Sequence, residues 1–235
     1  GIGCDQILSV GRPHLSQAWA SYRVFNADGG MAEHCGNGVR CLARYFDQRG
    51  ELSSKDVVLE TNGVSIPVKL ELDGDVAVDM GKPRFSPTEI PMNESREQMH
   101  YSVKLDDSKI EYGAVSIGNP HVVISVEDVK KASVRSIGLG FQTCDRFPDK
   151  VNVGFMQIND RNSLSLRVHE RGVGETLACG TGACAAVAVG RRWEMLDDEV
   201  IVELPGGTLR ICWDGVGSIW MSGPAMYVYE GTIEL

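Results

Sequence analysis

The sequence predicts an α+β fold of two pseudo-symmetric lobes, each a β-sheet wrapped around a central helix. Two observations carry this prediction. A glycine-rich tetrad, CGNG at residues 35–38, returns as CGTG at residues 179–182. After each tetrad the same patterns follow in the same order: a helix-like stretch, a β-rich segment, a turn and a second β-rich segment. A repeat on this scale indicates that one supersecondary unit is used twice.

The repeat fixes the expected elements in both halves. The matched pairs are the helices Val39–Asp47 and Ala183–Arg192, the strands Asp56–Glu60 and Glu199–Glu203, and the strands Val64–Leu72 and Thr208–Trp213. Short alternating or apolar runs predict further strands at Val76–Met80, Ala114–Ile117 and Leu164–Val168. We expect one lobe from residues 1–82 plus 225–235 and another from residues 83–224. The tail Tyr227–Leu235 is expected to return to the first lobe as a strand.

Composition narrows the classes of partner. The formal net charge of −9 repels a phosphate backbone and an anionic membrane, and no Lys or Arg run offsets it locally. We therefore expect neither a nucleic-acid nor a membrane partner. Seven cysteines are an odd number without a framework spacing, which favours reduced thiols in the cytoplasm. The longest apolar run, Cys184–Gly190, is too short to span a bilayer, and no signal peptide is visible.

Each tetrad begins with a cysteine just before an expected helix, at Cys35 and at Cys179. The helix dipole and the free N–H groups of the first turn favour a thiolate there. We expect both thiol pKa values to move from about 8.5 toward neutral pH. The same N–H groups can bind a carboxylate, and glycines let the backbone approach it closely. One tetrad can thus hold an α-carboxylate and place a sulfur beside the α-carbon.

Two such tetrads suit inversion at a carbon. If they line a cleft between the lobes, a thiolate on one side can remove a proton while a thiol on the other side supplies one. The sequence therefore predicts a cofactor-independent epimerase with Cys35 and Cys179 as the acid/base pair. Zinc is disfavoured because Cys35 and Cys41, and likewise Cys179 and Cys184, lack C-x-x-C spacing. A buried structural thiol is the alternative for either cysteine taken alone.

Short segments along the whole chain resemble the diaminopimelate epimerases. They are Gly1–Gln6, Phe25–Gly29, Cys35–Gly38, Gly118–His121, Asn152–Phe155, Glu170–Thr176 and Ala178–Ala183. The resemblance implies two lobes with the active site in the cleft between them, and interconversion of LL- and meso-2,6-diaminopimelate. That reaction serves lysine and peptidoglycan precursor biosynthesis. The resemblance also implies no pyridoxal phosphate, no metal and a homodimer.

The resemblance also assigns residues. It makes Cys35 and Cys179 catalytic and places the substrate α-carboxylate at the helix starts Gly36, Asn37, Gly180 and Thr181. Other substrate-binding positions match Gln6, Asn26, Asn119, Asn152, Glu170 and Arg171. His121 and Glu170 match residues that modulate the thiol pKa values, and Tyr229 a position linked to dimer formation. Plain structural roles are the alternatives: turn residues for the asparagines, a buried histidine, a surface ion pair for Arg171 and a strand aromatic for Tyr229.

One departure from the family keeps other functions open. The family usually begins with a strand and a Gly-Asn-Asp-Phe loop whose Asn binds substrate, and nothing matching it precedes Gly1. We therefore expect the first lobe to be incomplete relative to the family. The alternatives are a proline- or hydroxyproline-type racemase and a catalytically incomplete amino-acid-binding protein. Asn37 and the Glu170–Arg171 pair favour diaminopimelate over the racemases, which usually carry His at position 37.

Overall fold

The computed structural model describes residues 3–4, 6–27, 29–31, 36–105 and 108–232. The chain forms two compact units, which we call the N-terminal lobe (Gly1–Asp79 with Ser222–Leu235) and the C-terminal lobe (Met80–Met221). The chain thus leaves the first unit near residue 79 and returns to it near residue 222, whereas the sequence placed these boundaries at residues 82 and 224.

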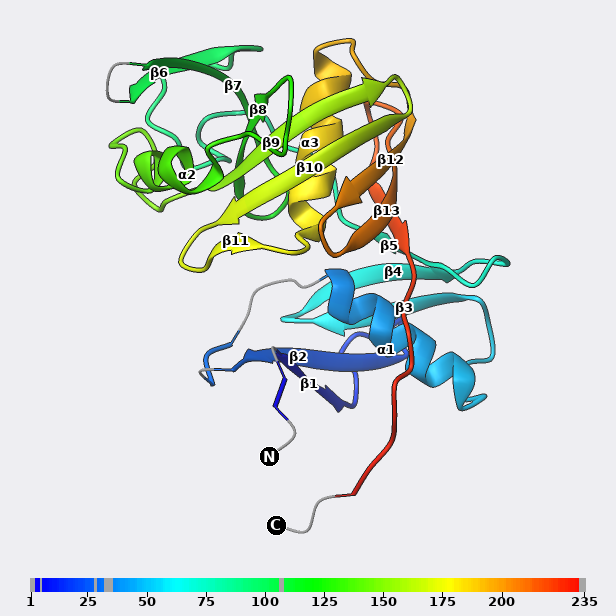
Figure 1. The fold of residues 1–235 in the computed structure, drawn as a ribbon. Helices are drawn as coiled ribbons and strands as arrows, with labels where there is room; N and C mark the ends of the chain where they lie inside the picture. Colours follow the sequence, from blue (N-terminus) through cyan, green and yellow to red (C-terminus); the bar gives the residue numbers. More distant parts are fainter. Residues whose placement is uncertain (1–2, 5, 28, 32–35, 106–107, 233–235) are drawn as a thin grey trace. The chain divides into compact units, whose positions relative to one another are not determined.

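The N-terminal lobe is one sheet with one helix. Its elements are β1 (Gln6–Gly11), β2 (Ala20–Asn26), α1 (Gly36–Gln48), β3 (Asp56–Thr61), β4 (Val64–Leu70) and β5 (Val76–Asp79). The strands lie in the order β1-β2-β3-β4-β5, and β2 and β3 are parallel while the other pairs are antiparallel. Helix α1 connects the two parallel strands and packs against β4 and β5 (Figure 1). Its buried face includes Val39, Leu42, Ala43 and Phe46, at helical spacing.

The C-terminal lobe has a longer sheet. Its elements are β6 (Tyr101–Leu105), β7 (Ser108–Ser116), β8 (Pro120–Ser125), α2 (Val134–Gln142), β9 (Asn152–Asp160), β10 (Ser163–Glu170), β11 (Gly174–Thr176), α3 (Gly180–Arg192), β12 (Glu199–Leu204), β13 (Gly207–Cys212) and β14 (Trp220–Gly223), whose last two residues belong to the N-terminal lobe. The strand order is β14-β13-β12-β10-β9-β8-β7-β6, with β11 paired to β10. Helix α3 is buried from Thr181 to Gly190 and contacts β7, β8, β9, β10 and β13. It is therefore the central helix of this lobe, as Figure 1 shows.

The predicted repeat is confirmed at the level of topology. In the N-terminal lobe, β2 leads through α1 to the parallel strand β3, which turns back into the antiparallel strand β4. In the C-terminal lobe, β10 leads through α3 to the parallel strand β12, which turns back into β13. Both helices begin at the second residue of a Cys-Gly-x-Gly tetrad. Two copies of one strand–helix–strand–strand unit therefore place Gly36 and Gly180 at equivalent helix starts.

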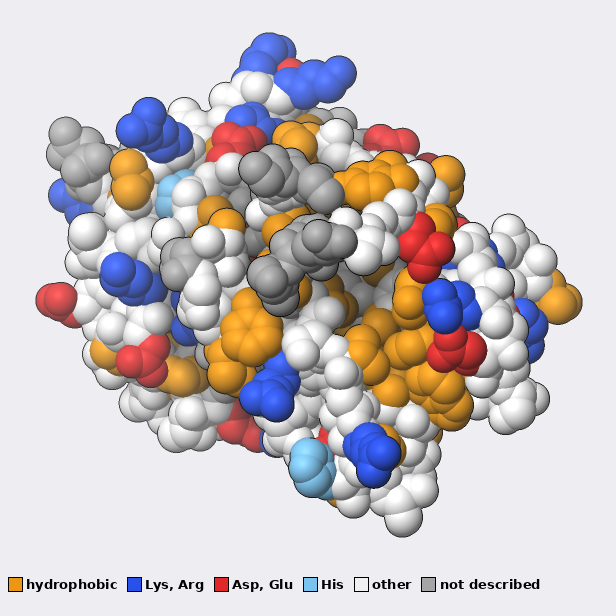
Figure 2. Space-filling model, turned by 90° about the horizontal axis from the view of Figure 1, so that it is seen from below, with side chains coloured by type: hydrophobic (Ala, Val, Ile, Leu, Met, Phe, Trp, Pro, Cys, Tyr) orange, Lys and Arg blue, Asp and Glu red, His pale blue; other side chains and the backbone are white. Residues whose placement is uncertain are grey.

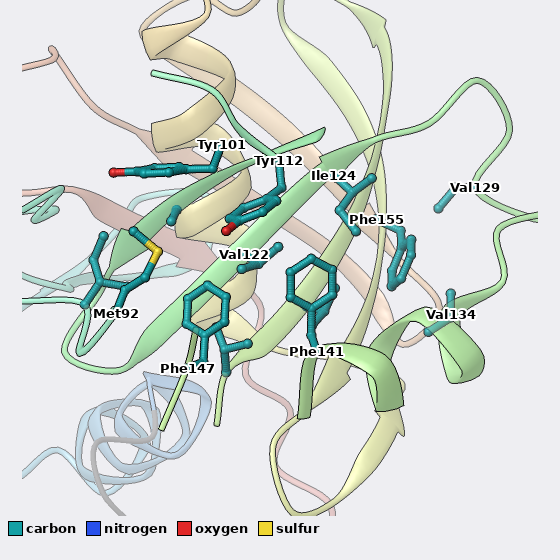
Figure 3. Packing of buried hydrophobic residues seen from close by; sticks show 14 residues of the cluster. Met92, Tyr101, Tyr112, Val122, Ile124, Val129, Val134, Phe141, Phe147 and Phe155 are labelled. Carbon is teal, nitrogen blue, oxygen red and sulfur yellow. The ribbon is translucent and has the colours of Figure 1, made fainter. Parts of the chain in front are cut away.

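Helix α2 was not predicted, because we expected a single main helix in each lobe. Its sequence contains Gly138 and Gly140, which disfavour a helix on propensity alone. Tertiary packing explains both glycines: a Cβ would lie 2.4 Å from the His169 ring at Gly138 and 2.9 Å from Leu105 at Gly140. Phe141 of α2 is fully buried and meets Tyr112 edge-on, with ring centroids 5.3 Å apart (Figure 3). Burial of this face, rather than propensity, stabilises the helix.

The C-terminal tail returns to the first lobe, as predicted, but the predicted strand is wrong for its described part. Residues 224–232 form no strand. Tyr227 instead stacks on Tyr45 of α1, with ring centroids 6.3 Å apart and planes 13° from parallel. Glu230 pairs with Arg49 near the end of the same helix. The alternating pattern of the tail therefore serves contacts with a helix instead of a sheet ladder.

One face of the molecule shows how its charged side chains are distributed. On the face that Figure 2 shows, Lys and Arg side chains stand singly or in small groups among acidic and uncharged ones. Of the helices that the structure describes, none combines the length and the apolar character that crossing a membrane requires.

The contact between β7 and α3 yields a test of the packing. At Gly113 a Cβ would lie 2.4 Å from Cγ1 of Val189 and 3.1 Å from Cζ2 of Trp193. Gly113→Ala should therefore lower the free energy of unfolding by about 1–3 kcal/mol, as overpacked cores do. Urea unfolding followed by circular dichroism measures it. The control is Gly231→Ala, where nothing lies within 4 Å. Equal stability of the two variants would mean that β7 and α3 do not pack this closely.

Candidate active site

Cys179 lies at the start of α3, which confirms the predicted position of this thiol. It is the N-cap residue, with extended backbone (φ −136°, ψ 104°), and its carbonyl accepts the N–H of Ala183 at 3.0 Å. Its side chain is 4% exposed. The sulfur lies 3.6 Å from Oγ1 of Thr181 and accepts from the backbone N–H of Gly182. The sulfur is thus held at the helix N-terminus by groups of the first turn.

The expected lowering of the Cys179 pKa is wrong in this structure. Burial raises the pKa of the thiol to about 12, and the negative charge of Glu170 and its hydrogen bond with the thiol add to the rise. Hydrogen bonds from Thr181 and Gly182 act in the opposite direction. Desolvation penalises a thiolate more than the helix start stabilises it. Cys179 is therefore a thiol at neutral pH.

A chain of hydrogen bonds links Cys179 to His121. Nδ2 of Asn119 donates to Oγ1 of Thr181 at 3.4 Å, and Oδ1 of Asn119 lies 2.9 Å from Nε2 of His121. Because this carboxamide oxygen can only accept, the histidine Nε2 carries a proton. Gly118 precedes Asn119 with φ +84°, a conformation that glycine adopts readily, and so turns the chain from β7 into β8. Asn119 thereby lies between the histidine and the helix start.

His121 is neutral over the physiological range. It is 1% exposed, and burial together with the positive charge of Arg171 lowers the pKa of its imidazole to about 3. A neutral ring with a proton on Nε2 donates steadily to Asn119 without adding charge to the site. The pKa-modulating role that the resemblance gives to His121 would therefore act through Asn119 and Thr181.

Asn152 and Arg171 complete the group around the end of β10. Asn152 is 1% exposed, and its Nδ2 donates to the carbonyl of Pro120 at 3.2 Å. Its Oδ1 accepts the backbone N–H of Arg171 at 2.9 Å. The carboxamide thus joins the start of β8 to the turn after β10. In this state Asn152 fixes the backbone that carries Glu170 and Arg171.

In the N-terminal lobe, two more predicted residues lie together. Gln6 and Asn26 are directly opposite in the β1–β2 pair, and Nε2 of Gln6 donates to Oδ1 of Asn26 at 3.0 Å. Gly36 and Asn37 form the first turn of α1, as predicted. Cys35 lies outside the described residues, so its predicted position stays a prediction.

The C-terminal lobe therefore brings seven predicted residues into one cluster, which we call the Cys179 cluster. Its members are Asn119, His121, Asn152, Glu170, Arg171, Cys179 and Thr181. The other helix-start position, Gly180, follows Cys179 directly. Tyr229 is 59% exposed on the tail.

Sequence reasoning missed two residues in contact with these groups. Thr176 donates from its hydroxyl to Oε1 of Glu170 at 2.5 Å. Arg40 is 6% exposed and donates from Nη1 to Oδ1 of Asn37 at 2.9 Å. A signal existed for Arg40, since a charged residue three positions after Asn37 falls on the same face of a helix. Thr176 lies in the segment Glu170–Thr176 that resembles the family, but only the folded hairpin shows that its hydroxyl contacts Glu170.

One group of side chains among the described residues could hold a cation. The carboxylates of Glu71, Asp73 and Asp75 lie close together at the turn between β4 and β5. Oxygen ligands of this kind suit Ca²⁺ or Mg²⁺. Exposed acidic groups at turns are common without an ion, and none of these residues belongs to the predicted site.

Comparison with known proteins places the chain in a family. The family model for diaminopimelate epimerase matches residues 1–86 and 113–228. The chain is 50% identical to the diaminopimelate epimerase of Alkalilimnicola ehrlichii, over 100% of this chain and 85% of that protein. The chain belongs to the diaminopimelate epimerase family. Another member, from Pseudomonas aeruginosa, is 47% identical over 100% of this chain and 86% of that protein.

Solved structures show how widely the fold of the diaminopimelate epimerases is used. A probable proline racemase from Agrobacterium radiobacter matches 98% of this chain and 76% of its own with a TM-score of 0.71, at 14% identity. A phenazine biosynthesis protein of the PhzF family from Bacillus anthracis matches 100% of this chain and 86% of its own with a TM-score of 0.68, at 20% identity. Likenesses at this level of identity concern the fold alone.

The low pKa of His121 predicts a pH-dependent stability. Below pH 6.5 the unfolded chain protonates this histidine, whereas the folded protein does not until pH nears 3. Folded stability is therefore lost as the pH falls through this window. Between pH 6 and pH 4 we expect the wild-type free energy of unfolding to fall roughly 2–3 kcal/mol further than that of His121→Gln.

Urea unfolding at several pH values measures this difference. His100→Gln is the matched control, because His100 is exposed and stacks on Trp193 at the surface. The control should keep the wild-type pH profile. A His121→Gln profile parallel to that of the wild type would show that His121 is not held neutral.

Proposed function

We propose that this protein interconverts LL- and meso-2,6-diaminopimelate by a two-base mechanism in which Cys35 and Cys179 act on opposite faces of the α-carbon. The observation that carries the proposal is the Cys179 cluster, where a buried helix-start thiol contacts an ionisable carboxylate in a chain of this family. This cluster supports the proposal because it combines a thiol that could donate a proton, a helix start that could bind an anion and a carboxylate that could pair with an ammonium group.

The protonation of Cys179 indicates which cysteine is the acid and which is the base in the unliganded enzyme. A thiol held protonated by burial and by Glu170 is ready to donate a proton to a carbanion. Cys35 would then be the thiolate that first removes the α-proton. The free N–H groups at Gly180 and Thr181 would bind the α-carboxylate and stabilise the negative charge that develops beside it.

The reverse direction needs Cys179 to become a base. We propose that the α-ammonium group of the substrate pairs with Glu170. Its positive charge would offset the contribution of Glu170 to the raised Cys179 pKa, which adds to the larger effect of burial, so bound substrate would lower the cost of forming the thiolate. The roles of the two cysteines can then exchange without a cofactor or metal.

Polar side chains of both lobes would recognise the two ends of the substrate. Arg171 offers a forked guanidinium for a carboxylate. The amides of Gln6, Asn26, Asn37, Asn119 and Asn152 can donate to carboxylates or accept from ammonium groups without adding charge. A substrate with two carboxylates and two ammonium groups matches such a set, whereas proline has one of each.

The cellular setting follows from this reaction. We propose a cytoplasmic enzyme of lysine biosynthesis, and of peptidoglycan precursor supply where the organism uses meso-diaminopimelate. We also propose a homodimer through the tail, because Met226, Val228 and Tyr229 are large apolar side chains that are 81%, 83% and 59% exposed.

Replacing either proposed acid/base residue should stop epimerisation. Cys35→Ala and Cys179→Ala each remove one proton-transfer group, so kcat should fall by roughly 100- to 10,000-fold in both directions. Chiral chromatography of LL- and meso-diaminopimelate over time measures both rates. Circular dichroism checks that the variants are folded.

Cys144→Ala is the control, because Cys144 is a free, half-buried cysteine after α2. It should keep wild-type rates. Substrate binding without turnover in the wild-type protein would indicate an amino-acid-binding protein instead. Normal turnover in Cys179→Ala would contradict the two-base mechanism.

A further inference from the structure

Thr176 holds the carboxylate on which the proposed mechanism depends. Its Oγ1 donates to Oε1 of Glu170 at 2.5 Å, in a half-buried position. A hydrogen bond from a hydroxyl to a carboxylate is short and strong, and it fixes the orientation of the acceptor. The other oxygen of Glu170 is left for other partners, and the Cys179 thiol is hydrogen-bonded to this same carboxylate.

The hairpin of β10 and β11 creates this contact. Glu170 ends β10 opposite Gly174, while Thr176 ends β11 opposite Val168. The two side chains are therefore diagonal neighbours, within reach of each other across the pair. Arg171 and Gly172 form part of the turn that joins the two strands.

The short segment after Thr176 keeps the Thr176 hydroxyl close to the Cys179 thiol. Only Leu177 and Ala178 separate Thr176 from Cys179. The carbonyl of Leu177 accepts the backbone N–H of Gly206 at 2.7 Å, which fixes this short linker to the turn between β12 and β13. At Gly206 a Cβ would lie 2.9 Å from that carbonyl oxygen, so glycine permits the approach. One short segment thus presents the hydroxyl and the thiol to the same carboxylate.

We propose that Thr176 is a positioning residue that keeps the Glu170 carboxylate turned toward both Cys179 and the substrate ammonium group. This inference rests on the proposed epimerisation. Without the hydroxyl, Oε1 loses its donor and the Glu170 side chain is free to rotate away from the thiol. Cys179 would then lose a nearby negative charge whose effect on the thiol adds to that of burial, and the substrate would lose an oriented partner.

Among the described charged groups near Cys179, Glu170 is the one that Thr176 contacts. From β10, Glu170 and Arg171 lie in the cluster, and from β8 the neutral His121 reaches it through Asn119. Glu170 is the charged group that acts on the Cys179 pKa, and it acts to raise it. A change at Thr176 that frees Glu170 should therefore move the titration of Cys179 to lower pH.

The same hairpin offers a matched control. Glu175 accepts from Nε of Arg167 at 2.6 Å, and Arg167 also donates to the carbonyl of Val129. Glu175→Gln removes this ion pair from β10 and β11 while leaving Thr176 and Glu170 unchanged. A role of Thr176 in merely stabilising the hairpin would make the control behave like a Thr176 variant.

The test compares Thr176→Val, Thr176→Ser and Glu175→Gln. Valine keeps the shape and the strand preference of threonine but removes the hydroxyl, whereas serine keeps it. Thr176→Val should lower kcat by roughly tenfold to a hundredfold, with a smaller change in KM, as expected for the loss of one hydrogen bond to a charged group. Thr176→Ser and Glu175→Gln should stay within about threefold of the wild type.

The second readout needs no substrate. Thiolate absorbance near 240 nm is followed against pH for each protein and for the same protein with Cys179→Ala, and the difference isolates Cys179. Its midpoint should fall in Thr176→Val and stay in place in Thr176→Ser and Glu175→Gln. A midpoint that does not move in Thr176→Val, or that moves equally in Glu175→Gln, would overturn the inference. Because the titration is independent of turnover, an inactive protein would contradict the proposed function without deciding this point.

Discussion

The contact between the end of β10 and the start of α3 is the constraint on which the site depends. It places the Glu170 carboxylate against the Cys179 thiol. The second glycine of the tetrad makes the approach possible, because a Cβ at Gly182 would lie 3.0 Å from Val168 and 3.2 Å from the Cys179 sulfur. The tetrad is therefore a packing motif as much as an anion-binding one. Gly182 lets the start of α3 lie directly on β10, the strand that ends in Glu170.

Two opposing electrostatic effects meet at this contact. The helix start and the donors at Thr181 and Gly182 favour a thiolate, whereas burial and Glu170 favour the thiol, and the second pair is larger. An unliganded thiolate would be exposed to oxidation and alkylation, so a protonated resting state protects the residue. A bound ammonium group would shift the balance at the moment when a base is useful. The fixed hydrogen bonds of Asn119, Asn152 and Thr176 keep the geometry constant while that charge changes.

Much of this arrangement could be predicted from the sequence, and the exceptions have physical reasons. The matched tetrads predicted α1, α3 and the strands after them because local spacing and propensity agree there. Helix α2 could not be predicted, since its glycines are explained only by contacts with His169 and Leu105. The tail reads as a strand but lies against Tyr45, a partner far away in sequence. The Cys179 pKa is raised rather than lowered because the thiol is buried, and a sequence motif does not reveal burial.

The central claim is that one group removes the proton from the substrate α-carbon and a different group delivers the new proton to it. The most direct measurement is epimerisation of LL-diaminopimelate in deuterium oxide, quenched after a few per cent conversion, with deuterium located by mass spectrometry in substrate and product separately. A two-base mechanism predicts one solvent deuterium in the meso product and almost none in the remaining substrate, because the donating thiol carries a solvent-derived proton. A product that retains the substrate proton, or a substrate that exchanges as fast as product forms, would contradict it.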